Sequence, residues 1–304
     1  MCLVALAIDA SERFPFVVAS NRDEFFKRPA APLGWWTPRH SPVPVLGGRD
    51  LESGGTWLGL TVAGRLALLT NVRGVMPVDS AAPSRGAVVT DWLTGGSSTG
   101  DFWKRAALSG YNGFNLVAAD FLRGECFWAS NTGAPRRELL PGVYGLSNGG
   151  LDAPWPKVAA LKARLRASID IATTVDDLAT QLFEALGDRT LAEDCTLPNT
   201  GIALDQERQL SAAFIHMPDQ RYGTRSSTLI IAERVGGRRV THVIERSFDA
   251  DGRAATLRRV SLPGWPPRAE TRLHDRHHND CDIATCAMPT SSNTGPAAVN
   301  PARE

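Results

Sequence analysis

The strongest constraint on the fold is an apolar run that begins at the second residue of the chain. Residues 2–8 are apolar without interruption and have the length of a buried strand, and Asp9 ends the run. Residues 14–20 form a second, mostly apolar run of strand length. Two such runs around a short polar segment predict that the chain begins with a β-hairpin. The hairpin would bring the residues after the second strand back beside Cys2.

Those next residues are the polar stretch Asn-Arg-Asp-Glu at positions 21–24. Successive side chains of a strand point to opposite faces of a sheet. If the strand continues through this stretch, Asn21 and Asp23 share one face, and Arg22 and Glu24 share the other.

Cys2 itself could be a nucleophile. A cysteine is small enough that the initiator Met1 in front of it is normally removed, which would leave a thiol and a free α-amine on one residue. An α-amine titrates at about 7.7–8.0 and a thiol near about 8.5, so the pair combines a nucleophile with a base near neutral pH. The alternative is an ordinary buried thiol at the start of a strand, because free cysteines are among the most buried residues.

Composition narrows the class of protein. Of 304 residues, 43% are hydrophobic and 21% are charged, which is typical of a globular chain with a full core. A net charge of +1 argues against general binding to nucleic acid or to anionic membranes. The five cysteines have no repeated spacing, which indicates a reducing compartment. No leader pattern and no run near ~20 apolar residues occur, so we expect a cytoplasmic protein without a transmembrane segment. The oligomeric state is left open.

The order of the expected elements predicts the fold class. Strands are expected at 56–61, 65–71, 114–120, 125–130, 142–148, 212–217, 226–233 and 239–248, and helices at 84–93, 101–108, 155–169, 175–186 and 190–195. Hairpins are followed by helices and then by hairpins again. This order predicts an α+β fold of two antiparallel sheets with helices outside them.

Two stretches have no periodic pattern. Residues 29–48 contain five prolines and the pair Trp35-Trp36, which predicts an irregular surface loop. The two tryptophans would either cover a pocket or pack onto the body of the protein. Residues 266–304 are rich in Pro, Thr, Ser and Asn, which predicts a disordered tail after a domain over residues 1–265. The histidines and cysteines of this tail match no zinc module, and we expect no metal site.

Four polar segments stand at the ends of expected strands: 21–23, 70–71, 147–148 and 223–225. Amide cleavage by a thiol requires an amide donor for the oxyanion, an acid to hold the α-amine and a cation that favours the thiolate. These segments contain all three residue types. They would supply this chemistry if the fold brings them together at Cys2.

The chain resembles a known family at these same positions. The matching segments are Met-Cys at 1–2, Asn-Arg-Asp-Glu at 21–24, and the segments 54–59, 70–73, 144–148 and 223–228. They are similar to the NRDE proteins, also called the Transport and Golgi organization protein 2 family, over about residues 1–250. The resemblance implies a four-layer αββα sandwich of the N-terminal-nucleophile hydrolase type. The activity of the family is poorly defined, and its eukaryotic members are linked to Golgi organisation and to haem and lipid handling.

A more distant resemblance connects the chain to cysteine-type amidases of the choloylglycine hydrolase and penicillin V acylase group. By motif position, this resemblance implies that Cys2 is the nucleophile and that Asp23 holds its α-amine. It also implies that Asn71 lies in the oxyanion hole, that Asn148 is a second active-site asparagine, and that Arg225 lies near the thiol.

The chain departs from those amidases at one position. They carry an arginine three residues before the aspartate, where this chain has Ser20. Arg22 is close in sequence, but strict alternation places it on the face opposite to Asp23. Asn21 and Arg22 are therefore expected to support the site rather than to form it.

The resulting prediction is a hydrolase of a linear amide or related acyl bond in a small molecule, with no cofactor. Two alternatives stay open. Residues 145–149 match the G-x-S-x-G pattern of a serine hydrolase, which requires a strand that turns directly into a helix. A haem or lipid carrier on the same scaffold is the other, although no C-x-x-C-H haem attachment motif occurs.

Overall fold

The computed structural model describes residues 2–74 and 78–267. Within these residues the strands form two antiparallel sheets, which we call sheet A and sheet B. Sheet A follows the order β10 (Gly142–Leu146), β1 (Cys2–Ile8), β2 (Phe16–Phe25), β12 (Tyr222–Val235), β13 (Arg238–Phe248) and β14 (Ala254–Pro263), with β11 (His216–Met217) paired to β12. Sheet B follows the order β3 (Ala30–Trp36), β4 (Val45–Asp50), β5 (Leu58–Leu60), β6 (Arg65–Asn71), β7 (Phe114–Asp120), β8 (Glu125–Ser130) and β9 (Arg137–Glu138).

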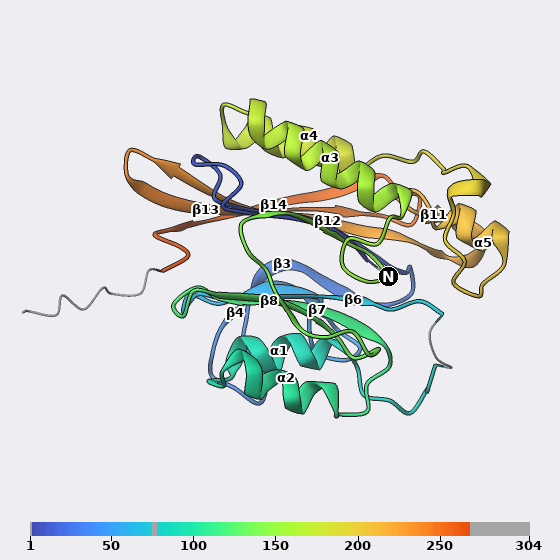
Figure 1. Ribbon diagram of the computed structural model, residues 1–304, viewed down its shortest axis with the longest axis horizontal. Coiled ribbons are helices and arrows are strands. Elements are labelled where there is room, and N and C mark those ends of the chain that lie inside the picture. The colour runs from blue at the N-terminus through green and yellow to red at the C-terminus, as the bar shows by residue number, and fades with distance from the viewer. Residues whose placement is uncertain (1, 75–77, 268–304) are drawn as a thin grey trace, which may run out of the picture. The chain divides into compact units, whose positions relative to one another are not determined.

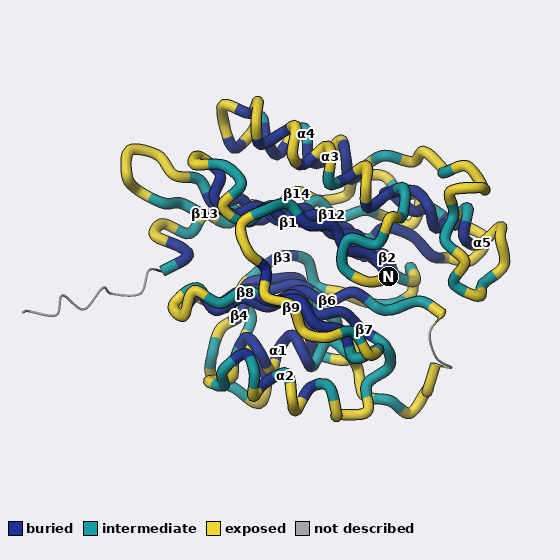
Figure 2. Tube along the Cα trace, in the orientation of Figure 1, coloured by how far each residue is buried: buried dark blue, intermediate teal, exposed yellow. Residues whose placement is uncertain are grey.

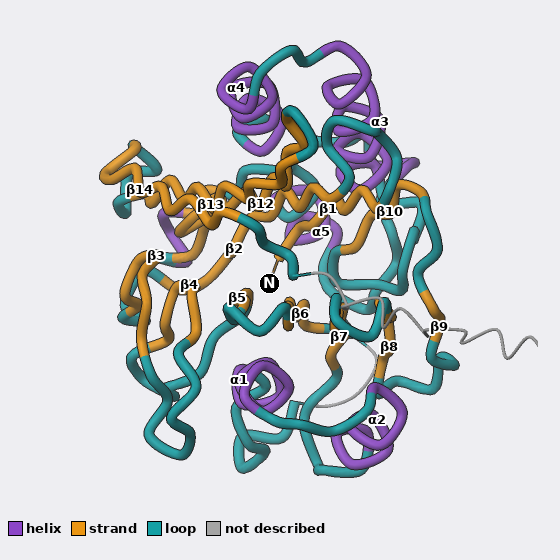
Figure 3. The backbone as a smooth tube through the Cα atoms, turned by 90° about the vertical axis from the view of Figure 1, so that its left-hand side faces the viewer, coloured by secondary structure: helices purple, strands orange, loops and turns teal. Residues whose placement is uncertain are grey.

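Helices cover the outer face of each sheet, as Figures 1 and 3 show. On sheet A lie α3 (Pro156–Ile171) and α4 (Val175–Leu186), and on sheet B lie α1 (Gly86–Thr94) and α2 (Thr99–Ala107). The short helix α5 (Leu204–Gln209) precedes β11. The predicted four-layer αββα arrangement is confirmed.

Three apolar clusters fill the three interfaces between the four layers. Strand alternation in β1 sends Leu3 and Ala5 toward α3 and α4, whereas Val4 and Leu6 point between the two sheets. A third cluster lies between sheet B and its helices and contains Trp92, whose indole donates to the Leu66 carbonyl at 3.0 Å. In Figure 2 the buried residues, drawn in dark blue, lie largely in the strands of both sheets. Sheet A is therefore buried on both faces along β1 and β2.

The predicted loop at 29–48 is wrong, because most of this segment forms β3 and β4. β3 is an edge strand of sheet B, and its register shifts between Ala31 and Gly34. Pro32 lies within this irregularity. A proline is tolerated there because an edge strand does not need every backbone N–H for pairing.

Most other expected strands and helices are confirmed, with differences near residues 190–217 and after 250. The predicted helix at 190–195 is a short 3-10 turn at Asp194–Thr196, and α5 was not expected. Only His216–Met217 of the predicted strand at 212–217 pairs as a strand. β14 was not expected, and its side chains are mostly exposed, so its sequence lacks the apolar alternation of a covered strand.

Hydrogen bonds join the segment 147–149, which follows β10 of sheet A, to sheet B and to Arg73 just after β6. Thr70 Oγ1 donates to the Ser147 carbonyl at 2.6 Å, and Asn148 Nδ2 donates to the Asn71 carbonyl at 2.8 Å. The Arg73 amide donates to the Asn148 carbonyl, and Asn115 Nδ2 donates to the Gly149 carbonyl, both at 2.8 Å. These bonds hold the ends of β10, β6 and β7 together.

Helix α1 begins unusually close to the loop before β5. A Cβ atom on Gly55 would lie 2.6 Å from the carbonyl oxygen of Gly86, the first residue of α1. Real Cβ contacts are not that short, so only glycine allows this approach. The close contact brings the start of α1 to the same end of the molecule as residues 147–149.

The helices of the described residues include none that is long and apolar enough to cross a membrane. The predicted disordered tail at 266–304 lies outside the described residues, except for Pro266 and Pro267. The histidines and cysteines singled out in that tail lie outside them as well.

Candidate active site

A pocket of about 750 Å³ opens at this end of the molecule and contains Cys2 in its wall. Its lining comes from both sheets, from the start of α1 and from the region around α5. The described lining is strongly charged, with the arginines Arg22, Arg28, Arg73 and Arg85 and the acids Asp23, Glu24, Asp50, Glu52 and Asp79. One group of apolar lining residues lies near α5, and others come from β2, β6 and the segments before β5 and α1: Ile202, Leu210, Met217 and Tyr222 in the first group, and Phe25, Leu69, Trp57, Ala82 and Pro83 in the second.

Cys2 is the first residue of β1 and is 7% exposed. Burial raises the pKa of its thiol above the ordinary value, and the negative charge of Asp23 acts in the same direction. The positive charge at the chain terminus, the Arg22 guanidinium and a hydrogen bond from the Asp23 backbone oppose this rise in pKa. A thiol in this position therefore needs a base or a nearby cation to react as a thiolate.

Arg22 lies directly opposite Cys2 in the antiparallel pairing of β1 and β2. Directly opposed residues of an antiparallel pair place their side chains on the same face. Cys2 therefore shares the face of Arg22, whereas Asp23 lies on the other face, as the alternation along β2 predicted. The Arg22 guanidinium is 4.3 Å from the ring centroid of Trp57 and is 5% exposed.

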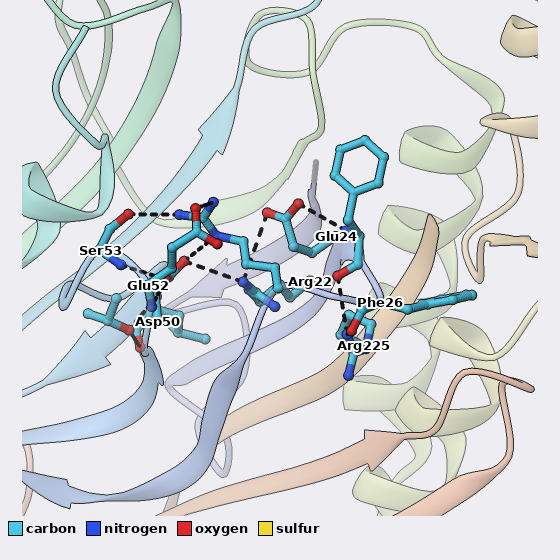
Figure 4. Close-up of polar contacts among 11 residues, drawn as sticks. Arg22, Glu24, Phe26, Asp50, Glu52, Ser53 and Arg225 are labelled. Carbon is cyan, nitrogen blue, oxygen red and sulfur yellow. Dashed lines mark hydrogen bonds and ion pairs between the residues drawn. The ribbon is translucent and has the colours of Figure 1, made fainter. Parts of the chain in front are cut away.

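Around Arg22, charged side chains form a connected network at the rim of the pocket, shown in Figure 4. Arg22 lies 3.6 Å from Asp50 and 3.9 Å from Glu24, and Arg28 donates to Asp50 at 2.7 Å. Arg28 also contacts Glu52 at 3.0 Å. Partial burial pushes the pKa of Asp50 up, but the hydrogen bond from Arg28 outweighs it and leaves that pKa below its usual value. Asp50 therefore stays ionised beside the arginines.

Asp23 points to the other face of β2, toward α3, and is 1% exposed. Its Oδ1 accepts a hydrogen bond from Thr224 Oγ1 at 2.7 Å. Burial raises the pKa of Asp23, and the positive charge of Lys157 is the largest opposing influence. Asp23 also lines the pocket, so its carboxylate lies near the start of β1 although its face differs from that of Cys2.

Asn71 ends β6 and lines the pocket. Within the described part of the chain, its side-chain amide has no hydrogen-bond partner, whereas its backbone carbonyl accepts from Asn148. An amide with free donors that faces a pocket is available to a ligand oxygen. Asn148 is 1% exposed and does not line the pocket; it braces Asn71 from behind.

Arg73 belongs to the matching segment 70–73, but no role in the site was predicted for it from the sequence. Its guanidinium donates to Asn148 Oδ1 at 3.3 Å, contacts Glu207 of α5 at 2.5 Å and lies 5.1 Å from the ring of Trp155. Burial lowers the pKa of Arg73, and Glu207 counteracts this effect. Arg73 therefore fixes Asn148 and ties α5 to the site.

Besides Asn148, two further predicted site residues lie outside the pocket lining. Asn21 donates to the carbonyls of Leu186 and Ala213, each at 2.8 Å, and accepts from Ser227 at 2.5 Å. It therefore connects β2 to the chain after α4. Arg225 lies at an irregularity of β12 and donates to the carbonyls of Phe25 and Phe26 at 3.3 and 2.8 Å, so that in Figure 4 it meets the backbone just after Glu24.

Several pocket residues were not expected from the sequence. Trp57, Arg85 and Tyr222 line the pocket, and Lys157 is buried beside Asp23. Trp35 and Trp36 were predicted to cover a pocket or to pack onto the body, and neither lines this one. Trp57 lies in the strand expected at 56–61, directly after Gly54-Gly55, and this position was the signal in the sequence that could have identified it.

The serine hydrolase alternative does not match the geometry. Ser147 follows β10, which pairs antiparallel with β1, and the next helix begins only at Pro156. A nucleophile elbow requires a strand that turns at once into a helix. Ser147 Oγ donates to the Cys2 carbonyl at 3.0 Å, so it holds the start of β1 in place.

The sequence matches the family model described as Transport and Golgi organisation 2 over residues 1–250. This match spans well over half of the chain. The protein belongs to the Transport and Golgi organisation 2 family. The family predicted from the motifs around Cys2 is thereby confirmed.

Members of this family from animals are similar to the protein over nearly their full length. The Transport and Golgi organization protein 2 homolog of Bos taurus is 31% identical over 298 residues, which is 90% of this chain and 98% of the relative. The homolog of Homo sapiens is 32% identical over 276 residues, covering 83% of this chain and 95% of the relative.

Solved structures with a similar chain trace include a mutant conjugated bile acid hydrolase from Clostridium perfringens, with a TM-score of 0.45 and 11% identity. That match covers 86% of this chain and 92% of the bile acid hydrolase. An N-acylethanolamine-hydrolyzing acid amidase ortholog from Caenorhabditis elegans has a TM-score of 0.38 and 10% identity over 76% of this chain and 92% of the amidase.

Proposed function

We propose that the protein is a cysteine-type N-terminal-nucleophile hydrolase that cleaves a linear amide or a related acyl bond of a small molecule. The observation that carries the proposal is the position of Cys2 in the wall of the pocket, directly opposite Arg22. Removal of Met1 would place the α-amine on the same residue as the thiol, so that nucleophile and base are adjacent. Asp23 and Asn71 line the same pocket, which supports roles for both.

In the proposed reaction, the α-amine of Cys2 accepts the thiol proton and the thiolate attacks the substrate carbonyl carbon. The Asn71 side chain donates to the resulting oxyanion, and a donor of this kind contributes about 3–4 kcal/mol. The C–N bond then breaks as the ammonium returns the proton to the leaving nitrogen, which leaves a thioester on Cys2. Water that is deprotonated by the same amine hydrolyses the thioester and restores the thiol.

Arg22 and Asp23 have different roles in this proposal. The guanidinium of Arg22 counteracts the effect of burial on the pKa of the Cys2 thiol. Asp23 holds the α-amine in position, as the resemblance to cysteine-type amidases implies. Asn148 acts through Asn71, because its side chain fixes the Asn71 backbone and not a pocket atom.

The carrier alternative stays a prediction, and the described lining fits it poorly. A lipid site is lined mainly by apolar and aromatic side chains. This pocket instead carries arginines and carboxylates along much of its wall, and its apolar residues are interspersed among these charges. The described lining residues include no histidine that could bind a haem iron.

The first test is the intact mass of the purified protein before and after alkylation with iodoacetamide. We expect a species that lacks Met1 and takes up one label at Cys2 faster than at the exposed Cys195. The triple variant Cys195→Ala, Cys281→Ala and Cys286→Ala is the matched control that removes competing thiols. Retention of Met1 in active protein, or a Cys2 that reacts no faster than Cys195, would contradict the proposal.

The second test measures turnover of a panel of acyl p-nitroanilides with chains of increasing length. We expect hydrolysis by the wild-type protein and none by Cys2→Ala or by a protein with extra residues before Cys2, because such residues convert the amine into an amide. Hydrolysis that survives either change would exclude Cys2 as an N-terminal nucleophile.

A further inference from the structure

Arg85 is a pocket arginine that the proposed reaction does not use. It directly precedes α1, is half-buried and lines the same pocket as Cys2. Its Nη1 donates to the Gly113 carbonyl at 3.2 Å. Within the described residues this is its only side-chain hydrogen bond, and no carboxylate lies within the 4.0 Å ion-pair distance of its guanidinium. A guanidinium has five N–H donors, so most of its donors have no partner in the described chain.

Each of the other arginines in the described lining has a carboxylate partner. Arg28 lies 2.7 Å from Asp50, and Arg22 lies 3.6 Å from the same carboxylate. Arg73 forms an ion pair with Glu207 of α5. Among the described lining residues, the arginine before α1 is therefore the one whose charge no described carboxylate matches.

Backbone hydrogen bonds place Arg85 beside the end of β6. The Gly113 carbonyl that accepts from Arg85 also accepts from the Val72 amide at 3.0 Å. Val72 directly follows Asn71, the last residue of β6. The guanidinium of Arg85 and the free amide of Asn71 therefore lie on the same side of the pocket.

The start of α1 also packs against the segment that contacts Arg22. A Cβ atom on Gly86 would lie 3.2 Å from the Thr56 carbonyl oxygen. Thr56 precedes Trp57, whose ring centroid lies 4.3 Å from the Arg22 guanidinium, and Arg22 lies directly opposite Cys2. The start of α1 is thus held against the end of β6 and against the segment beside β2, the two strands that carry the proposed reaction.

A guanidinium with free donors in a pocket wall is suited to bind an anionic group of a ligand. Its planar edge of two parallel N–H donors matches a carboxylate. In Arg85 the edge formed by Nε and Nη2 makes no described hydrogen bond. A phosphate dianion fits less well, because the other lining arginines are already paired and the acids of the lining repel a second negative charge.

We propose that the substrate carries a carboxylate group and that Arg85 is the specificity-determining residue that binds it. The proposal names the substrate class of the site and in that respect rests on the proposed function. The binding of a carboxylate by Arg85 does not require Cys2 to react.

The test compares matched substrates that differ only in a carboxylate or a neutral carboxamide. On the acyl side these are succinyl, glutaryl and adipoyl p-nitroanilide and their terminal amides. On the amine side they are N-butyryl-4-aminobenzoate and N-butyryl-4-aminobenzamide. The measured quantity is the ratio of kcat/KM for the charged member to that for the neutral member of each pair. We expect a ratio of about ten or more for at least one pair in the wild type, because hydrogen bonds between charged groups are the strong ones.

Variants of Arg85 show whether this residue causes the preference, with near-UV circular dichroism as a check of folding. The ratio should fall to near one in Arg85→Met and be intermediate in Arg85→Lys, which keeps the charge but loses the planar edge. Arg123→Met is the matched control, because Arg123 is exposed in the turn after β7 and does not line the pocket. It should leave the ratio unchanged. A ratio near one for every pair in the wild type, or an unchanged ratio in folded Arg85→Met, would overturn the proposal.

A binding readout separates this proposal from the proposed function and does not depend on a variant that lacks the charge. The Arg85 Nε–Hε resonance of 15N-labelled wild-type protein, assigned with Arg85→Lys, is followed during titration with butyrate, butyramide and inorganic phosphate. We expect a saturable shift with butyrate and none with butyramide. If no substrate is hydrolysed but butyrate shifts the resonance, the hydrolase fails and the carboxylate site stays. A resonance that ignores butyrate, or that responds to phosphate alone, excludes the carboxylate site whether or not Cys2 reacts.

Discussion

The two faces of β2 at its last residues carry charge in different ways. On the face between the sheets, Arg22 and Glu24 belong to a network whose charges lie within 4 Å of one another at the rim of the pocket. On the helix face, Asp23 is almost fully buried and accepts a hydrogen bond from the Thr224 hydroxyl at 2.7 Å. Neighbouring residues of one strand thus differ in their charged surroundings, although Arg22 itself is also buried.

The difference teaches where single substitutions will be costly. A network at a rim can exchange a lost partner for water or for another carboxylate, so exposed pairs contribute at most about 1 kcal/mol. A buried charge has no such substitute when its partner is removed. We therefore expect the helix face to set stability and the rim face to set only the reactivity of Cys2.

The largest effect is expected from Asp23→Leu, which leaves Lys157 charged and buried without its main partner. The free energy of unfolding should fall by about 3–5 kcal/mol. Urea unfolding at pH 7 measures it. Glu24→Gln on the other face of the same strand is the matched control and should change stability by less than about 1 kcal/mol. Equal losses in the two variants would erase the contrast between the faces.

The next effect concerns pH and Lys157. Its folded-state pKa, about 8, lies below the unfolded value near 10.5, so the unfolded state holds this proton more tightly. Stability should therefore rise as pH increases from about 8 toward 10.5, by up to about 3 kcal/mol. Denaturant midpoints of the wild type minus those of Lys157→Met isolate this contribution. Parallel curves for the two proteins would show that Lys157 does not titrate in this range.

A smaller loss is expected from Asn21→Ala. The change leaves the carbonyls of Leu186 and Ala213 and the hydroxyl of Ser227 without their buried partner. The expected loss is about 2 kcal/mol in thermal or urea unfolding, within the range for an unsatisfied buried group. Asn199→Ala, at an exposed turn, should stay within about 0.5 kcal/mol. A similar loss of unfolding free energy in both variants would indicate that the effect comes from replacing asparagine by alanine in general and not from the burial of Asn21.

The smallest effect is expected from Arg28→Met at the rim. Arg28 contacts Asp50 and Glu52, but Glu52 is largely exposed, so the loss should be below about 1 kcal/mol. Raising the ionic strength to about 1 M should shrink it further, because salt screens exposed charges. A loss that exceeds that of Asn21→Ala would mean that the rim carries more stability than its exposure suggests.

The sequence predicted the layers and most of the elements, because alternation and amphipathic spacing follow directly from burial on one or both faces. It did not predict the register between β1 and β2. Alternation along one strand shows that Arg22 and Asp23 point apart, but only the pairing of Cys2 with Arg22 shows which of them shares the nucleophile's face. That pairing depends on the turn between the strands, whose geometry the apolar pattern does not encode.

The residues missed in the site share a physical reason. Lys157 lies on the buried stripe of α3, four and eight residues before Leu161 and Leu165, but a lysine is almost never fully buried, so its charge masked what the spacing indicated. The carbonyl that anchors it belongs to Leu210, more than fifty residues away. Strand β3 was missed because its proline argues locally against a strand. At the edge of a sheet a proline is tolerated, and the sequence does not show that β3 is an edge strand.

The hydrogen bonds that join residues 147–149 to β6 and β7 mean that the pocket is formed where the two sheets meet and not by either sheet alone. A graft of Cys2 and its neighbours onto another αββα protein must therefore include the connected ends of both sheets. A chimera that exchanges one sheet alone would keep its core yet misalign the cavity.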